Sequence, residues 1–174
     1  MAILIARAAR TYVLLAALLG TLPALQLPEF PLEYQVKAAF LFNFLKFVDW
    51  PLPADGRPWV IGVLGKDPFM ESLEDMVRGK TVNGRSVIVR HFAHPGDVRD
   101  CHILFIPRAE FKRVGIVLLP GVLTVGEADG FLAAGGVINF VLVDQKVHFE
   151  ASAQAAKAAG LHVSAQLLHL GAAK

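Results

Sequence analysis

The sequence predicts a single α/β domain with a mostly parallel sheet, flanked by helices, and an antiparallel hairpin at the edge of the sheet. Continuous apolar runs at 59–64, 103–106, 122–125 and 137–143 are typical of strands covered on both faces. Helical patterns alternate with these runs, as in layered α/β domains. Asp144-Gln145 predicts a tight turn into 146–150, so the last two strands are expected to pair antiparallel.

Residues 1–24 have the layout of a secretory signal peptide. Arg7 and Arg10 precede an apolar run at 12–19, and small residues with Pro23 follow. We expect export with cleavage near Ala24, and the folded domain at 33–171. The alternative is an uncleaved membrane anchor, although the run is shorter than the ~20 apolar residues that a membrane span needs.

The charge that remains after residue 24 argues against nucleic acid as a partner. The whole chain has 17 Lys and Arg and 15 Asp and Glu. Residues 1–24 hold Arg7 and Arg10 and no acidic residue, so the remainder has equal numbers of basic and acidic side chains. A domain without net charge or a basic run has no electrostatic reason to bind nucleic acid or lipid headgroups.

The stretch 33–51 predicts one long helix that ends at Trp50-Pro51. At 100° per residue, a wide apolar arc contains Phe47, Phe40, Phe44, Val48, Leu41, Leu45 and Ala38. The opposite polar stripe contains Asp49, Gln35, Lys46 and Asn43, with Phe42 among them. A large aromatic side chain among polar ones is expected to face a second subunit or a partner. We therefore predict an interface at Phe42, Gln35, Asn43 and Lys46.

The middle of the chain alternates strands and turns. Asp67 is predicted to cap a helix that begins at Pro68 and ends before Gly79. Asn83-Gly84 predicts a two-residue hairpin turn between 81–82 and 86–91. A short helical turn should precede the run at 103–106, and a short helix should follow from Arg108.

The last third of the chain is expected to be mainly helical outside its two strands. A short helix is predicted between Gly126-Glu127 and Ala134, and Gly135-Gly136 should end it. Two further helices are predicted at 151–159 and at about 164–170.

No catalytic constellation is visible, and we predict that the chain is not an enzyme. The sequence lacks the Gly-x-Ser-x-Gly elbow of hydrolases, and Cys101 and His102 should point to opposite faces of a strand. Cys101 is expected to act as a small apolar residue, the alternative being a reactive thiol. Neither a metal nor a cofactor is predicted, because the histidines are scattered without carboxylates at ligand spacing.

Polar residues at the ends of predicted strands are candidates for ligand binding. Lys66 follows the first strand, where a turn into a helix could hold an anionic group on backbone amides, the alternative being a plain turn. Glu127 and Asn139 lie beside other strand ends, and Glu150 closes the last strand. Each could instead be a helix cap or a solvated loop residue.

Several motifs in a fixed order resemble one known family. They are YQVKAAFLFNF at 34–44, FVDWP at 47–51, GKTVNG at 79–84, CHILFI at 101–106, LTVGE at 123–127, GGVINF at 135–140, VHFE at 147–150, AGL at 159–161 and SAQLL at 164–168. Together they resemble the YfiR family of exported proteins, over about 33–170.

The resemblance implies a periplasmic α/β domain that tends to form a homodimer. The best-known member of the family represses an inner-membrane diguanylate cyclase by binding the periplasmic sensor domain of that enzyme, which limits cyclic-di-GMP and biofilm formation. This chain departs from the family at His148, where an arginine is usual, at Phe42, where a tyrosine is usual, and in its shorter 108–122 segment. Its single cysteine also excludes the intramolecular disulfides of better-known members.

Two functions from different classes follow. The first is a periplasmic regulator that represses a membrane-bound diguanylate cyclase. The alternative is a periplasmic small-molecule receptor coupled to a membrane sensor kinase or cyclase, with a ligand near Lys66, Glu127, Asn139, His148 and Glu150.

Overall fold

A computed structural model describes residues 32–50 and 56–172. The predicted signal peptide at 1–24 and its cleavage near Ala24 lie outside the described residues. Among the helices that are described, none is both long enough and apolar enough to cross a membrane.

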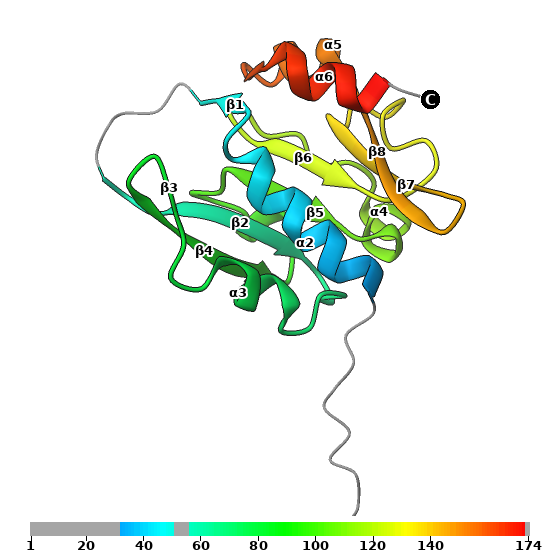
Figure 1. Ribbon diagram of the computed structural model, residues 1–174. Coiled ribbons are helices and arrows are strands. Elements are labelled where there is room, and N and C mark those ends of the chain that lie inside the picture. Colours follow the sequence, from blue (N-terminus) through cyan, green and yellow to red (C-terminus); the bar gives the residue numbers. More distant parts are fainter. Residues whose placement is uncertain (1–31, 51–55, 173–174) are drawn as a thin grey trace, which may run out of the picture.

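A seven-stranded sheet in the order β3-β4-β2-β5-β6-β7-β8 forms the centre of the domain (Figure 1). Its strands are β2 (Trp59–Leu64), β3 (Thr81–Val82), β4 (Arg85–Phe92), β5 (Ile103–Ile106), β6 (Leu123–Gly126), β7 (Ile138–Val143) and β8 (Lys146–Ala151). The five strands from β4 to β7 are parallel, whereas β3 and β8 pair antiparallel at the two edges. The predicted α/β class and the hairpin of β7 and β8 are confirmed.

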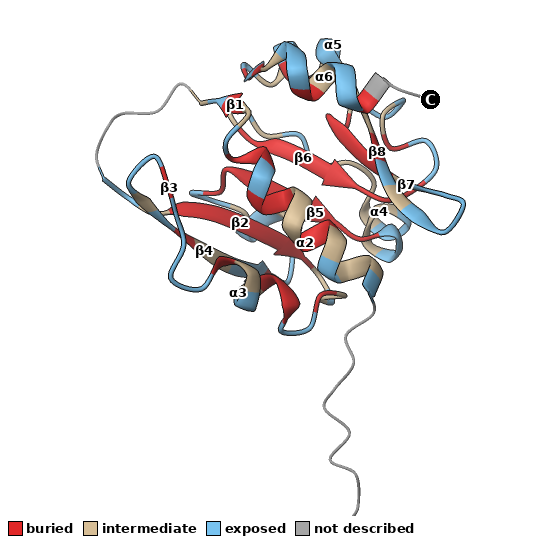
Figure 2. Cartoon of the chain, viewed as in Figure 1, coloured by how far each residue is buried: buried red, intermediate tan, exposed pale blue. Residues whose placement is uncertain are grey.

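Helices cover both faces of the sheet, and each face has its own core. They are α2 (Leu32–Phe44), α3 (Ser72–Val77), η1 (Pro95–Asp97), α4 (Arg108–Val114), α5 (Ala153–Ala158) and α6 (Ala165–Ala172). The larger core lies under α2 and α3, and a smaller core packs against α4. The central strands β2, β5 and β6 are buried along their whole length, as their red colour in Figure 2 shows.

The prediction of one helix from 33 to 51 is wrong, because α2 ends at Phe44. Val48 and Asp49 instead form β1 (Val48–Asp49), which pairs antiparallel with β9 (His162–Val163). The backbone of Phe47 also accepts a hydrogen bond from Ser164 N at 2.9 Å. The backbone N–H and C=O groups that a longer helix would have bonded internally are therefore bonded to the C-terminal segment.

The expectation that Phe42 is exposed is also wrong. Its side chain is 9% exposed and belongs to the larger core. The ammonium groups of Lys46 and Lys80 lie 4.7 and 5.2 Å from the centre of its ring. Because α2 packs against α3 as well as against the sheet, two sides of α2 are covered. An interface role for Phe42 therefore loses its physical basis.

Two predicted helices are shorter than expected or absent. Asp67 Oδ1 accepts a hydrogen bond from Phe69 N at 2.8 Å, but α3 begins only at Ser72. Met70 has a φ of +57°, which interrupts right-handed helix at that point. The stretch after Glu127 forms turns in place of the predicted helix, with positive φ at Gly130 and Gly135. Local backbone geometry explains both differences.

The glycines that flank this turn region make room for Phe131. A Cβ at Gly136 would overlap the Phe131 ring and lie 2.9 Å from the Phe131 carbonyl oxygen. We therefore expect Gly136→Ala to lower the free energy of unfolding by about 1–3 kcal/mol, the usual range for overpacking. Urea denaturation measures this effect. Gly96→Ala is the control, because a Cβ there has nothing within 4 Å, and equal stability of the two variants would contradict the packing argument.

Candidate functional site

A cavity of about 740 Å³ opens at the carboxyl ends of the parallel strands. Counting only the parallel strands, their order is 2-1-3-4-5, and the connections from β2 and β5 leave the sheet in opposite directions. Ligands of open α/β sheets bind at such switch points. The lining includes Tyr34, Lys37, Lys66, Asp67, Arg108, Lys112, Glu127, Asp129 and Asn139.

A buried ion pair forms the inner wall of this cavity. Lys37 Nζ lies 2.6 Å from Glu127 Oε2, and the two side chains are only 4% and 9% exposed. The same ammonium group contacts the carboxylate of Glu33, one turn earlier on α2. Removing both charges from water is costly, and their mutual attraction offsets this cost. The loss of either partner would therefore leave an uncompensated buried charge. It joins α2 to the end of β6.

Tyr34 and the backbone of Arg108 complete the surroundings of Glu127. The Tyr34 hydroxyl lies 3.3 and 3.4 Å from the two Glu127 carboxylate oxygens, and Arg108 N donates to Oε1 at 3.3 Å. Burial raises the pKa of the Tyr34 phenol, and the negative charges of Glu127 and Glu33 raise it further. The phenol therefore stays protonated and donates to Glu127.

The rim of the cavity is more basic and more exposed than its inner wall. Lys66, Arg108 and Lys112 are exposed there, and Arg108 Nη1 lies 3.7 Å from a carboxylate oxygen of Asp129. Asp67 lies on the same rim, and burial raises the pKa of its carboxyl group. The arrangement can hold a polar ligand whose anionic part faces the rim.

The structure brings together three of the five predicted ligand-binding residues. Lys66, Glu127 and Asn139 line the cavity, and Asn139 Oδ1 accepts a hydrogen bond from Ala128 N at 3.1 Å. His148 and Glu150 are outside the lining, on β8. In the hairpin, His148 pairs with Val141 and Glu150 pairs with Asn139. Their side chains therefore project from the same face of the sheet as those of Val141 and Asn139, which line the cavity.

Sequence reasoning missed the residues that the cavity takes from α2 and α4. Tyr34 and Lys37 lie on a helix that follows no strand, and Lys112 lies one turn into α4, whereas Arg108 follows the end of β5 as Lys66 follows the end of β2. One signal was available: at 100° per residue, Lys37 falls inside the apolar arc of its helix. A lysine on a buried helix face requires a buried acidic partner.

Asp67, Glu74 and His91 form a cluster that sequence intervals did not indicate. Each offers one ligand atom, and these atoms lie within 4.8 Å of one another. His91 Nε2 lies 2.8 Å from Glu74 Oε1, and His91 Nδ1 lies 4.0 Å from Asp67 Oδ2. Two carboxylates and an imidazole are ligand types that divalent cations accept. Sequence intervals gave no sign of this cluster, because the two carboxylates come from other elements of the fold than His91.

Cys101 is a buried thiol in the smaller core. Its Sγ lies 2.8 Å from the carbonyl oxygen of Ile103, and burial raises its pKa from 9.0 to about 12. At neutral pH the folded chain should therefore have about 10³-fold less thiolate than an unfolded one. The role of a small apolar residue fits this environment, and that of a reactive nucleophile does not.

We expect N-ethylmaleimide to label Cys101 at pH 7.5 at least about 10³-fold more slowly in the native protein than in urea. Mass spectrometry measures both rates. The folded-state pKa lies above the unfolded one, so this thiol should also destabilise the fold as the pH rises from 9.0 toward about 12. Equal labelling rates with and without urea would contradict the assignment.

A family model described as YfiR/HmsC-like matches residues 34–172. None of the curated proteins matches the chain.

Proposed function

The chain belongs to the YfiR/HmsC-like family, and from this membership we propose that it represses an inner-membrane diguanylate cyclase by binding the periplasmic sensor domain of that enzyme. The observation that carries the proposal is the extent of the family match, from α2 to α6. The family is regulatory and periplasmic. Repression, the cyclase partner and export by a cleaved signal peptide are parts of the proposal.

We propose that the exposed residues on α2 and just after it contact the cyclase or a second copy of the chain. Gln35, Asn43 and Lys46 are exposed, and Lys46 Nζ donates to Asn43 Oδ1 at 3.0 Å. Phe42 no longer belongs to this surface, because it is packed inside the same chain. The remaining contact surface is polar, as the rims of regulatory interfaces usually are.

Cross-linked capture from membranes tests the partner. A tagged chain should retain a membrane-bound diguanylate cyclase that mass spectrometry identifies. Lys46→Glu should reduce the recovered cyclase at least tenfold, whereas Lys157→Glu, an equal charge change on exposed α5, should not. Gel filtration of both variants reports whether position 46 serves the homodimer instead. Equal capture and equal oligomeric state in the two variants would remove this surface from the proposal.

The second candidate is a periplasmic small-molecule receptor, and one observation favours it. The cavity of about 740 Å³ has the size of small-molecule sites and contains a buried acid, a buried lysine and a basic rim. Thermal unfolding with a panel of amino acids and nucleotides tests it. A ligand at 100 times its dissociation constant stabilises the fold by about 2.7 kcal/mol. If no member of the panel raises the unfolding temperature, the receptor function loses its support.

A further inference from the structure

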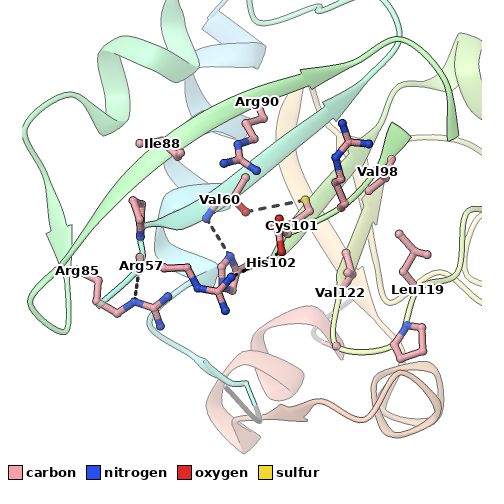
Figure 3. Close-up of a pocket in the computed structure, with 15 residues that line it drawn as sticks. Arg57, Val60, Arg85, Ile88, Arg90, Val98, Cys101, His102, Leu119 and Val122 are labelled. Carbon is pink, nitrogen blue, oxygen red and sulfur yellow. Dashed lines mark hydrogen bonds and ion pairs between the residues drawn. The ribbon is translucent and has the colours of Figure 1, made fainter. Parts of the chain in front are cut away.

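A second cavity of about 550 Å³ lies at the opposite end of the strands from the first (Figure 3). It is lined by the beginning of β2, by β4 and by the segments that lead into β5 and β6. On this face of the sheet, Phe111 and Val114 of α4 pack in one apolar cluster with Leu64, Leu104 and Ile106.

The floor of this cavity is apolar. Val60, Ile88 and Val122 lie on it, and Leu119 joins them from the loop before β6 (Figure 3). Val60 and Ile88 are paired neighbours on β2 and β4, so their side chains project from the same face of the sheet. A floor of branched aliphatic side chains favours a ligand with an apolar body.

The walls of the same cavity carry four arginines, Arg57, Arg85, Arg90 and Arg99, and one acid, Asp100. Arg57 Nη1 lies 3.8 Å from Asp100 Oδ1. In the part of the chain that the structure describes, Arg90 and Arg99 form no ion pair. The chain beyond residue 24 has no net charge, yet the charged groups around this cavity leave an excess of three positive charges. Such a concentration of one sign attracts an anion.

One of the arginines, Arg85, is held in place by neighbouring groups. The Arg85 guanidinium lies 4.1 Å from the centre of the Trp59 ring, and its Nε donates to the Arg57 carbonyl oxygen. Arg90 stands opposite Gly62 in the pairing of β4 with β2, and its charge acts on the Cys101 thiol at the side of the cavity. Guanidinium groups that are already oriented lose little entropy when they bind a carboxylate or phosphate.

We propose that this cavity binds a small organic anion, with its carboxylate or phosphate group on the arginines and its apolar body on the floor of Val60, Ile88 and Val122. The size of about 550 Å³ suits a single small molecule. The site is separate from the cavity around Glu127 and does not depend on the proposed repression of a cyclase.

Titration of the full chain with four probes tests the proposal. The probes are cyclohexanecarboxylate, cyclohexyl phosphate, the neutral cyclohexanecarboxamide and inorganic phosphate. None absorbs where tryptophan does, so calorimetry and the fluorescence of Trp50 and Trp59, whose rings lie 5.2 Å apart, can both report binding. We expect one molecule of an organic anion per chain, bound at least tenfold more tightly than the amide and than inorganic phosphate. The organic anion that binds more tightly shows whether the site prefers a carboxylate or a phosphate group.

Paired substitutions locate the site. Arg90→Gln with Arg99→Gln should weaken binding of the preferred anion at least tenfold. Arg78→Gln with Arg113→Gln removes the same charge from exposed positions outside the cavity and should leave the affinity unchanged. Circular dichroism checks that both variants fold.

Three results would overturn the proposal. They are no binding of either organic anion, equal affinity for inorganic phosphate, and equal loss of affinity in the two double variants.

Discussion

Lys37→Met is expected to lower the free energy of unfolding by about 3–5 kcal/mol, the range measured when one partner of a buried ion pair is removed. The substitution leaves the Glu127 carboxylate buried, with only the Tyr34 hydroxyl and the Arg108 amide as hydrogen-bond donors. Both carboxylate oxygens would then lack the positive charge that lies 2.6 Å from Oε2. Urea denaturation followed by circular dichroism measures the loss.

Two further variants separate the buried charge from other effects. Glu33→Gln removes the other carboxylate that contacts Lys37, but Glu33 is 36% exposed, so the cost should be within about 1 kcal/mol. Lys37→Met combined with Glu127→Met removes both buried charges and should recover most of the lost stability. If Lys37→Met is as stable as Glu33→Gln, the pair does not anchor α2 to the sheet.

Phe44→Ala is expected to cost about 3–5 kcal/mol as well, because it opens a cavity between α2 and the sheet. Phe44 is 1% exposed, and its ring centre lies 5.2 Å from that of Phe149 and 6.0 Å from those of Phe40 and Phe140. These contacts hold the end of α2 against the hairpin of β7 and β8. Chemical denaturation gives the value.

Phe44→Leu is the matched control for this prediction. It keeps most of the buried apolar volume and loses only the ring contacts, so it should cost clearly less than the alanine variant. A cost below about 1 kcal/mol for Phe44→Ala would mean that this aromatic cluster does not fix the position of α2.

The strands were predictable from sequence because their signals are local and unambiguous. The runs at 59–64 and 103–106 have no polar side chain, as buried parallel strands require, and both are strands with these bounds. Asn83 and Gly84 both have positive φ, which explains why that dipeptide marks the hairpin of β3 and β4. The family resemblance is also confirmed, because the YfiR/HmsC-like family model matches residues 34–172.

Features that depend on distant segments were not predictable from sequence. The end of α2 is set by β9, more than a hundred residues later in the chain, and no local signal at Phe44 announces it. Phe42 lay on a polar stripe of the helical wheel, but a wheel cannot show that its ring packs in the core beneath Lys46 and Lys80. The helix expected after Glu127 failed for a local reason, since Gly130, inside the predicted span, adopts a positive φ.

The candidate site shows the same division between local and distant signals. Strand-end reasoning found Lys66, Glu127 and Asn139, because the carboxyl ends of parallel strands meet at one edge of the sheet. It could not pair Glu127 with Lys37, since the two are 90 residues apart and belong to different kinds of element. The arginines of the second cavity were missed because none of them follows the carboxyl end of a strand: Arg57 and Arg99 lie on connecting segments, and Arg85 and Arg90 lie within β4.

Cellular cyclic-di-GMP in a strain that lacks this gene is the most direct test of the proposed repression. We expect cyclic-di-GMP to rise when the gene is deleted and to return to its original level when the full chain is supplied again. Unchanged cyclic-di-GMP after deletion, together with no diguanylate cyclase captured from membranes by the tagged chain, would contradict the proposal.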